Sequence, residues 1–424
     1  MSSRRAAAEL LVAVADEGSA LEDALAATPS YAALVGRDRA FARAIVTAAL
    51  RRLGGIDAVL AQFLERPLPA SAAHGRAMLR IGAAQMLVLE TPAHAAVGET
   101  VAAAQTLPEA RGFARLINAV LRRVAREGPA LLAAQPPGAD LPAWLFTRWR
   151  AAYGAATADA IALALRQEPP LDLTVKDDAR GWAERLGGDV RPTGGVRVPI
   201  EARSAVSELA GYQQGAWWVQ DAAAALPARL LGDVRGLDVL DLCAAPGGKT
   251  MQLAAAGARV TAVDKIAERL ERLSANLRRT RLGAEILCAD ALEWAPGGRF
   301  DAVLLDAPCT STGTMRRHPD IAWLRRPTDV RALAELQARM LEHARTLLKP
   351  GGKLVYAVCS LEPEEGPGVV AQAITSGAWT RDPITASELP VEFITPEGDM
   401  RTLPSHWPER GGLDGFFAAR LTPA

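Results

Sequence analysis

The sequence predicts a multidomain protein with an all-α N-terminal part, a small α+β segment and a C-terminal α/β domain built on a doubly wound, mainly parallel sheet. Two patterns predict this fold class. The first part of the chain carries apolar residues at helical spacing without a convincing strand, and the last part alternates short apolar runs with helical stretches. The length of 424 residues exceeds one ordinary core and favours roughly two to three domains.

Successive amphipathic helices account for the chain from Ala6 to about Glu127. Stripes of apolar side chains at this spacing form the core of a helical bundle. The clearest stripes carry Phe113, Leu116, Ile117, Val120, Leu121 and Val124, and Phe41, Ile45, Val46, Leu50 and Leu53. The stretch from Gly128 to Pro142, which contains Pro136-Pro137-Gly138, then predicts a break and a linker.

A mixed segment and a strand-rich region make up the rest of the chain. Between Trp144 and about Arg235, a Trp- and Arg-rich helix, a possible strand over 171–175 and a polar-aromatic turn over 211–218 indicate a small α+β segment. Beyond Gly236, apolar runs predict strands over 237–242, 259–264, 284–290, 300–306 and 353–359. Strands that alternate with helices imply a mainly parallel sheet. We therefore divide the chain into domains 1–130, 141–235 and 236–424.

Composition narrows the class of protein. No apolar run approaches the ~20 residues that span a bilayer, so we expect a soluble, cytoplasmic protein without a membrane partner. The formal net charge is 0, which gives no global argument for nucleic-acid binding. The four cysteines, Cys243, Cys288, Cys309 and Cys359, form neither a disulfide framework nor a familiar zinc pattern, so we assign no metal site.

A glycine-rich loop follows the first strand of the C-terminal domain. It reads Cys243-Ala244-Ala245-Pro246-Gly247-Gly248-Lys249-Thr250. Paired glycines let the backbone approach a ligand closely, and the helix that follows presents unpaired N–H groups to it. A phosphate-binding P-loop does not fit, because Cys243 stands where that motif needs glycine, and the GxGxxG dinucleotide fingerprint is absent. The residues from Cys243 to Lys249 are therefore candidates for binding another nucleotide-like cofactor.

Two acidic residues end the next two predicted strands. Asp264 is positioned to accept hydrogen bonds from ribose hydroxyls, and Asp290 could accept from an adenine amino group. Either aspartate alone would more often cap a helix or a turn. Two such acids at successive strand ends beside a glycine-rich loop favour an adenosyl ligand without a phosphate to cradle, such as S-adenosylmethionine.

Cys309 and Cys359 follow the fourth and fifth strands, next to the expected ligand site. An accessible, polar environment there can lower the pKa of a thiol, which makes both residues candidates for catalysis. Cys288 has the ordinary interpretation of a small buried apolar residue, and Cys243 has no evident chemical role. The run Asp306-Ala307-Pro308-Cys309 replaces the Asp/Asn-Pro-Pro-aromatic signature of amino-group methyltransferases, which points toward carbon methylation.

Ordered motifs give the chain from about Trp144 onward a resemblance to the NOL1/NOP2/Sun family of RNA cytosine-C5 methyltransferases. The N-terminal helices resemble a NusB-like RNA-binding domain, notably over residues 113–123. The matching motifs are Gln220-Asp221, residues 243–250, Asp264, Asp290, residues 306–313, Arg316-Arg317-His318-Pro319-Asp320, residues 348–352, residues 359–365 and Asp414-Gly415-Phe416-Phe417. The resemblance covers nearly the whole chain and implies a Rossmann-like domain that uses S-adenosylmethionine.

The resemblance assigns different roles to the two cysteines. In this family a thiolate, here Cys359, bonds to cytosine C6, and a second cysteine, here Cys309, assists release after the methyl group arrives. Asp306 is expected to border the cofactor and to hydrogen-bond the N3/N4 edge of the base. Lys249 either assists in this pocket or is a solvated lysine at a helix start.

The resemblance also indicates the substrate. It implies a cytosine of 16S rRNA in the position-967 class, which must be single-stranded, looped or flipped out, because a duplex hides its C6 face. We expect the mixed segment together with Arg316, Arg317 and His318 to form the RNA surface. We also expect a monomer.

Three alternatives remain open. A DNA cytosine-C5 methyltransferase would use Cys309 as the nucleophile, although a second cysteine at 359 and the helical N-terminal part argue against it. Another RNA, a tRNA or a different rRNA site, is also compatible. Two departures from the family pattern bear on the RNA contacts and the exact substrate. Residues 171–176 lack the Arg-Val-Asn usual in the family, and Glu364-Glu365 continues into Gly366-Pro367-Gly368 in place of Asn-Glu. The third alternative is a non-catalytic RNA-binding assembly factor with the same fold.

Overall fold

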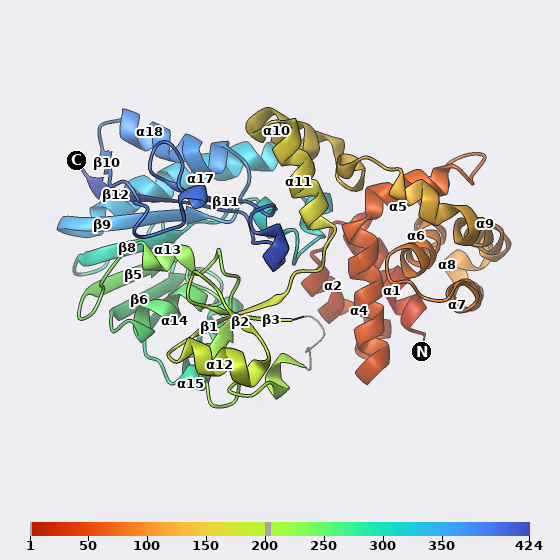
Figure 1. Cartoon of the computed structure of the whole chain (residues 1–424), viewed down its shortest axis with the longest axis horizontal. Helices are drawn as coiled ribbons and strands as arrows, with labels where there is room; N and C mark the ends of the chain where they lie inside the picture. Colours follow the sequence, from red (N-terminus) through yellow and green to blue (C-terminus); the bar gives the residue numbers. More distant parts are fainter. Residues whose placement is uncertain (1, 200–204) are drawn as a thin grey trace. The chain divides into compact units, whose positions relative to one another are not determined.

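The chain forms two compact units in the computed structural model, which describes residues 2–199 and 205–424 (Figure 1). One unit comprises Met1–Gln167 with Met315–Arg326, and the other comprises Glu168–Thr314 with Pro327–Ala424. The expected mixed segment contains residues 200–204, which lie outside the described residues. In the described ranges, no helix combines the length and the apolar character that a membrane span requires.

The first unit, here the helical unit, is all-α over its described residues, as the sequence predicts. In α9 the side chains of Ile117, Val120 and Val124 are buried in one core. The packing is close, since a Cβ on Gly82 of α6 would lie 2.4 Å from Leu121 Cδ1. The helices are α1 Ser3–Ala15, α2 Leu21–Ala27, α3 Pro29–Ala32, α4 Gly36–Arg51, α5 Leu53–Ala61, α6 Ala73–Leu87, α7 Ala93–Thr106, α8 Pro108–Arg111, α9 Ala114–Ala133, α10 Ala143–Tyr153, α11 Ala155–Leu165 and α16 Ile321–Leu324.

Helix α9 does not end at Gly128, where the sequence predicts a linker, but continues to Ala133. The prediction of a break at this point is wrong. Pro129 inside the helix removes one backbone N–H and disfavours it locally. Gly128, however, packs closely on α6, because a Cβ there would lie 3.0 Å from Leu87 Cδ2. Tertiary packing therefore outweighs the local preference for a break.

The segment Met315–Arg326 belongs to the helical unit, although it follows the fourth strand of the C-terminal domain in sequence. Trp323 donates its Nε1–H to the carbonyl of Leu50 at 2.9 Å, and Arg51 donates to the carbonyl of Arg316 at 2.6 Å. The side chain of Arg316 is only 1% exposed. The expectation that Arg316 contributes to an RNA surface is therefore wrong, because the segment packs as part of a folded core.

The second unit, here the sheet unit, begins with a four-stranded antiparallel sheet in the order β2-β3-β1-β4. Leu173, Leu186 and Trp217 are buried together beneath it, which confirms the strand predicted over 171–175 and the small α+β segment. The polar-aromatic turn leads directly into β4. The elements are β1 Leu171–Val175, α12 Ala179–Leu186, β2 Asp189–Val190, β3 Val196–Val198 and β4 Trp217–Val219.

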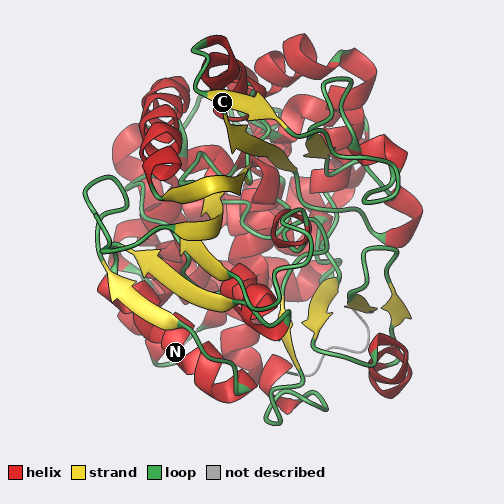
Figure 2. Cartoon of the chain, turned by 90° about the vertical axis from the view of Figure 1, so that its left-hand side faces the viewer, coloured by secondary structure: helices red, strands yellow, loops and turns green. Residues whose placement is uncertain are grey.

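An eight-stranded sheet forms the centre of the sheet unit (Figure 2). Its order is β10-β12-β9-β8-β5-β6-β7, with β11 paired to β12. Strands β5 to β9 pair in parallel, which confirms the doubly wound sheet, whereas β10, β11 and β12 are antiparallel additions that the apolar runs do not predict. The elements are β5 Asp238–Leu242, β6 Arg259–Asp264, β7 Glu285–Cys288, β8 Phe300–Asp306, β9 Leu348–Val358, β10 Trp379–Arg381, β11 Met400–Thr402, β12 Phe416–Pro423, α13 Leu226–Arg229, α14 Gly248–Ala255, α15 Ala267–Thr280, α17 Pro327–Thr346 and α18 Val369–Thr375.

The strands of this sheet separate two layers of core. Alternate residues of β8 point to opposite faces, so Val303 and Leu305 pack with Leu341 of α17, while Ala302 and Leu304 pack on the other side. A strand buried on both faces reads as a continuous apolar run, which explains why its range can be predicted. Strands β6 and β8 occupy the predicted ranges 259–264 and 300–306.

Strand β9 is longer than its apolar run. It begins at Leu348 and not at residue 353, because Leu348 pairs with Phe300 across an irregularity in the register. Gly351 in this stretch has a φ of 75°, a left-handed conformation that favours glycine. The Pro-Gly-Gly sequence that resembles a loop is therefore part of an irregular strand start.

The end of the β8–β9 pairing sets the position of the two cysteines. The carbonyl of Ala357 accepts the backbone N–H of Ala307 at 2.9 Å. The loop after β8 then returns to the sheet, because Gly313 donates its N–H to the carbonyl of Cys359 at 3.0 Å. Gly415, just before β12, donates to the carbonyl of Gly313 at 2.8 Å and fixes the loop from a second side.

Substituting Gly313→Ala should destabilise the sheet unit, because the new Cβ would lie 1.9 Å from the backbone oxygen of Gly415. Forcing an atom into packed backbone lowers the free energy of unfolding by about 1–3 kcal/mol. Denaturant unfolding measures the change. Gly298→Ala is the control, since a Cβ there meets nothing within 4 Å. Equal stability of the two variants would contradict the proposed clash.

Candidate active site

A cavity of about 300 Å³ opens at the carboxyl ends of the parallel strands, the edge where doubly wound sheets bind ligands. It unites most of the residues predicted from the sequence. These are Cys243, Ala245, Asp264, Asp290, Asp306, Cys309 and Cys359, joined by Lys265, Arg269, Ser311 and apolar residues that include Leu336 and Met340 of α17. The other predicted loop residues, Ala244, Pro246, Gly247, Gly248 and Lys249, are not among those that line it.

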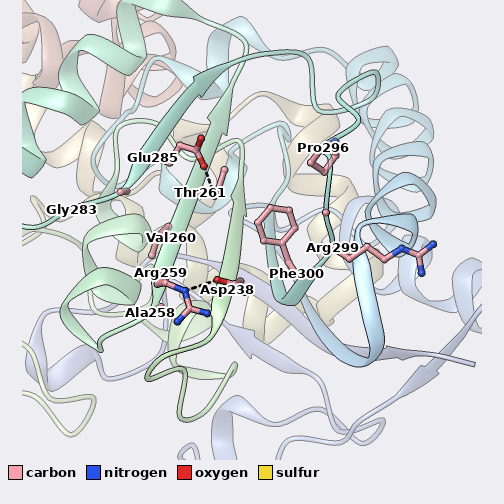
Figure 3. A pocket seen from close by; sticks show the side chains of 12 residues that line it. Asp238, Ala258, Arg259, Val260, Thr261, Gly283, Glu285, Pro296, Arg299 and Phe300 are labelled. Carbon is pink, nitrogen blue, oxygen red and sulfur yellow. Dashed lines mark hydrogen bonds and ion pairs between the residues drawn. The ribbon is translucent and has the colours of Figure 1, made fainter.

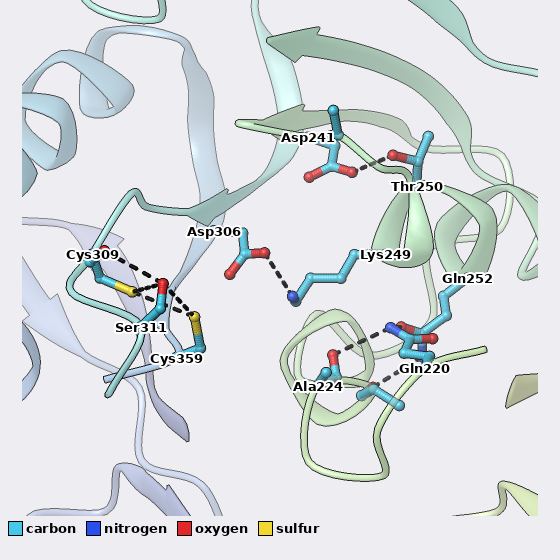
Figure 4. Close-up of polar contacts among 12 residues, drawn as sticks. Gln220, Ala224, Asp241, Lys249, Thr250, Gln252, Asp306, Cys309, Ser311 and Cys359 are labelled. Carbon is cyan, nitrogen blue, oxygen red and sulfur yellow. Dashed lines mark hydrogen bonds and ion pairs between the residues drawn. The ribbon is translucent and has the colours of Figure 1, made fainter. Parts of the chain in front are cut away.

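Cys309 and Cys359 lie side by side in this cavity (Figure 4). Their Sγ atoms are 3.4 Å apart, and Ser311 Oγ lies 3.6 Å from the sulfur of Cys359. Both are free thiols. Cys359 is half-buried, whereas Cys309 is buried. The prediction of an accessible environment is therefore wrong for Cys309.

The two thiols are not equivalent. The hydrogen bond with Cys359, together with burial, raises the pKa of Cys309 well above its usual range. The same hydrogen bond lowers the pKa of Cys359, and it outweighs burial and the negative charge of Asp306, which act in the opposite direction. Cys359 is therefore the sulfur that loses its proton first, with the S–H of Cys309 as its donor.

Lys249 forms an ion pair with Asp306, whose side chain lines the cavity (Figure 4). Its Nζ lies 2.7 Å from Asp306 Oδ2 and 5.2 Å from the centre of the Phe416 ring. Lys249 is only 8% exposed. The alternative of a solvated lysine at a helix start is therefore wrong, because α14 starts at Gly248 but the lysine side chain turns inward to the carboxylate.

Asp264 and Asp290 lie at the ends of β6 and β7 as predicted, and each already has a local structural role. Asp264 is buried and accepts the N–H groups of Ala245 at 3.2 Å and Ile266 at 3.1 Å, while Asp290 accepts that of Leu292 at 2.9 Å. A carboxylate has about four lone-pair positions, so both can still accept from a ligand. Two such acids beside apolar side chains fit the hydroxyls and amino group of an adenosyl cofactor.

Asp241, the last residue but one of β5, is a buried acid just before this loop. Its Oδ2 accepts the hydroxyl of Thr250 at 2.6 Å, which ties β5 to α14 (Figure 4). Burial raises the pKa of Asp241 to about 7, with the charges of Asp306 and Asp264 acting in the same direction. Asp241 therefore changes its protonation state near neutral pH.

The other two cysteines do not take part in the sulfur pair. Cys288 is exposed, so its interpretation as a buried apolar residue is wrong; β7, which it ends, is the edge strand of the sheet. Cys243 lines the cavity with a left-handed backbone, φ 62°. Burial, followed by the charges of Asp264 and Asp306, raises the pKa of Cys243, so it remains a thiol.

A second hollow, of about 620 Å³, lies at the opposite, amino ends of the strands (Figure 3). Its polar side chains bond to each other: Arg259 pairs with Asp238 at 2.7 Å, and Thr261 donates to Glu285 at 3.0 Å. Neither cysteine nor histidine is among its lining residues. Although larger, it offers no thiol nucleophile.

Sequence reasoning misses three residues that complete the site, Ser311, Gln337 and Glu365. Glu365 accepts the backbone N–H of Thr310 at 2.8 Å and the hydroxyl of Ser360 at 2.5 Å, and Gln337 donates to it at 3.1 Å. Ser311 and Glu365 stand within motifs shared with the family, which is a signal that could have found them. Gln337 lies on an ordinary amphipathic helix and offers no such signal.

The fold and the site define a class: a methyltransferase with a doubly wound catalytic domain, paired cysteines at adjacent strand ends and a helical N-terminal domain. Residues 229–422 match the family described as 16S rRNA methyltransferase RsmB/F, and residues 1–126 match the NusB family. On these matches and on full-length relatives, the chain belongs to the family of ribosomal RNA small subunit methyltransferase B.

Relatives of that name cover the whole length of the chain. The protein from Xanthomonas campestris pv. campestris is 38% identical over 100% of this chain and 98% of its own. The protein from Erwinia tasmaniensis is 35% identical over 98% of this chain and 97% of its own. The crystal structure of PH0851 has a TM-score of 0.76 at 22% identity and covers 99% of both chains, which shows the shared fold.

Replacing Cys309→Ala should raise the pH at which Cys359 reacts, because the variant loses the S–H donor that lowers the pKa of Cys359. Alkylation by iodoacetamide across pH, resolved by peptide mass spectrometry, gives the midpoint for Cys359 alone. Cys309→Ser keeps a donor and should retain a low midpoint. If wild type and Cys309→Ala share one midpoint, the asymmetry of the thiols is refuted.

Replacing Asp241→Asn should change how stability depends on pH. The folded pKa of about 7 lies above the unfolded value of about 3.9, so the stabilising contribution of Asp241 is present below pH ~4 and is lost as pH rises through about 7. Asparagine cannot ionise. The melting temperature of the variant should therefore rise relative to wild type between these pH values. A constant difference across this range would contradict the raised pKa.

Proposed function

We propose that the chain methylates C5 of a cytosine in 16S rRNA, with S-adenosylmethionine as methyl donor and a covalent bond between Cys359 and cytosine C6. The observation that carries the proposal is the pair of free thiols 3.4 Å apart in a cavity at the carboxyl ends of β8 and β9. Cytosine C5 is a poor nucleophile until a group adds at C6. A thiolate there is the chemical requirement that this site meets.

Cys359 is the attacking residue in this proposal. Its lowered pKa favours the thiolate form of Cys359, and the hydrogen bonds that lower it come from Cys309 and Ser311. When its sulfur bonds to C6, the electron pair of the C5–C6 double bond moves into the ring and makes C5 nucleophilic. The negative charge leaves the sulfur at the same step.

Cys309 acts second. The largest cause of its raised pKa is the hydrogen bond with Cys359, and this cause disappears once Cys359 is bonded to carbon. After C5 has gained the methyl group, Cys309 gives its proton to a water molecule and, as a thiolate, takes the proton from C5. The electron pair of that C–H bond restores the C5–C6 double bond, and Cys359 leaves as a thiolate.

Asp306 and Lys249 complete the base pocket. Asp306 accepts a hydrogen bond from the exocyclic amino group at the N3/N4 edge, and Lys249, 2.7 Å from its carboxylate, offsets the negative charge that enters the ring. Asp306 ends β8 and lines the same cavity as both sulfurs, so its carboxylate can face a base bound beside them. Lys249 is thus assigned to charge stabilisation.

The cofactor site consists of the loop 243–250 with Asp264, Asp290 and Asp306. Gly247 has a φ of 99° and lets the loop turn tightly before α14. Asp264 would hold the ribose hydroxyls and Asp290 the adenine amino group. S-adenosylmethionine, when bound, supplies an electrophilic methyl group on a sulfonium.

The target cytosine must be unpaired or flipped out for a thiol to reach C6. The names of the relatives support a small-subunit rRNA substrate, and we assign the position-967 class to it. We further propose that the chain acts as a monomer in the cytoplasm. The helical domain 1–130 and the segment 141–235 hold the RNA, while 236–424 carries the chemistry.

Single cysteine variants test the order of events. With undermodified 16S rRNA and S-adenosylmethionine, Cys359→Ala should form no covalent adduct and no 5-methylcytosine. Cys309→Ala should accumulate a protein–RNA adduct on a denaturing gel, because its release step is blocked. Wild type is the control and should give 5-methylcytosine with little adduct.

Other outcomes would support the alternatives. Loss of the adduct in Cys309→Ala with retention in Cys359→Ala would reverse the roles, as in DNA cytosine-C5 methyltransferases. Methylation of a tRNA or of another rRNA site in preference to 16S rRNA would reassign the substrate. A wild-type chain that binds the RNA without producing 5-methylcytosine would be a non-catalytic assembly factor.

A further inference from the structure

We propose that Glu365 is a positioning residue that holds the two cysteine-bearing loops at their reactive distance, an inference that rests on the proposed function because it concerns the same thiols. Glu365 is 0% exposed and lies in the π-helical turn Glu364–Gly368 that follows β9. Its carboxylate bonds to the residue directly after each cysteine. It therefore acts on the sulfurs through Thr310 and Ser360.

On the β8 side, the carboxylate of Glu365 accepts hydrogen bonds from the loop at the point where backbone pairing with β9 ends. Ala307 still donates its N–H to β9 at 2.9 Å, but Pro308 has no N–H with which to continue. Thr310, directly after Cys309, donates its backbone N–H to Glu365 Oε1 at 2.8 Å and its hydroxyl to Oε2. Two donors from one residue fix both the place and the orientation of this loop.

On the β9 side, Ser360 directly follows Cys359 and donates its hydroxyl to Glu365 Oε2 at 2.5 Å. The same hydroxyl accepts the N–H of Glu362 at 3.0 Å, and it lies 3.1 Å from the hydroxyl of Thr310. One carboxylate oxygen thus joins the loops after both cysteines. A shift of either loop would break the hydrogen bond between the sulfurs.

The glutamate itself is held by its surroundings. Gln337 of α17 donates to Glu365 Oε1 at 3.1 Å, and Tyr356 of β9 donates its hydroxyl to the backbone carbonyl of Glu365 at 2.5 Å. Gly366 packs on Phe417, where a Cβ would come within 2.9 Å of the ring. This contact explains why glycine follows Glu365 here.

A carboxylate is the group that suits this position. Four donors converge on two oxygens: one backbone N–H, two hydroxyls and one amide. A carboxylate only accepts hydrogen bonds and can satisfy all four, whereas glutamine would turn an N–H group toward one of them. Burial raises the pKa of Glu365, and the hydrogen bonds from Ser360, Thr310 and Gln337 act in the opposite direction and favour the carboxylate form. Glu365→Gln should therefore weaken the arrangement, and Glu365→Ala should remove it.

The first assay needs neither cofactor nor RNA. Iodoacetamide alkylation of Cys359 across pH, resolved by peptide mass spectrometry, reports the hydrogen bond between the sulfurs. We expect the midpoint to rise toward the ordinary thiol value in Glu365→Gln and further in Glu365→Ala. A role in general stability alone would lower the melting temperature and leave this midpoint unchanged.

The second assay is single-turnover methylation of 16S rRNA. We expect the rate constant to fall about 100-fold in Glu365→Ala and about tenfold in Glu365→Gln, because a displacement of about 1 Å can have an effect of this size. The RNA concentration at half-saturation should not change. Glu364→Gln is the matched control, since Glu364 occupies the same turn and is exposed; it should match wild type in both assays.

A folded Glu365→Gln chain with the wild-type alkylation midpoint and the wild-type rate would overturn the positioning role. So would a variant that loses only thermal stability. If the wild-type chain itself makes no 5-methylcytosine, the proposed function fails, while the alkylation midpoint still decides the role of Glu365.

Discussion

The site depends on one constraint, the parallel pairing of β8 with β9. Parallel neighbours end at the same edge of a sheet, so residues far apart in sequence meet where the strands stop. The sulfurs of Cys309 and Cys359 come to 3.4 Å by this route. Beyond the last backbone hydrogen bonds between β8 and β9, two contacts hold the loops that follow these strands. They are the hydrogen bond from the N–H of Gly313 to the carbonyl of Cys359 and the hydrogen bonds accepted by the carboxylate of Glu365. A slip in this pairing would separate the thiols.

Local hydrogen bonds determine which thiol is reactive, and their effect exceeds that of the surrounding negative charges. Burial, followed by the charges of the acids around the cavity, raises the pKa of Cys243, and the charge of Asp306 acts on Cys359 in the same direction. At Cys359 the hydrogen bonds with the S–H of Cys309 and with Ser311 reverse this effect, and the one with Cys309 is the larger cause. The asymmetry that sequence position alone leaves open thus has a physical cause that does not depend on family resemblance.

The sequence predicts whatever a local pattern encodes. The strands β6 and β8 are buried apolar runs, and their ranges are predicted correctly. The motif residues Cys309, Cys359 and Asp306 do meet in one cavity. Local patterns do not predict features that depend on tertiary packing. Examples are the continuation of α9 through Pro129 and the place of Met315–Arg326 in the helical unit. Cys288 is exposed because its strand lies at a sheet edge.

The site of covalent attachment to RNA tests the central claim most directly. An RNA substrate with 5-fluorocytosine at the target carries no proton at C5 for removal, so the adduct persists. After incubation with the wild-type chain and S-adenosylmethionine, nuclease and protease digestion followed by mass spectrometry locates the modified cysteine. The account predicts the nucleotide on the peptide that contains Cys359. Attachment at Cys309 would contradict it.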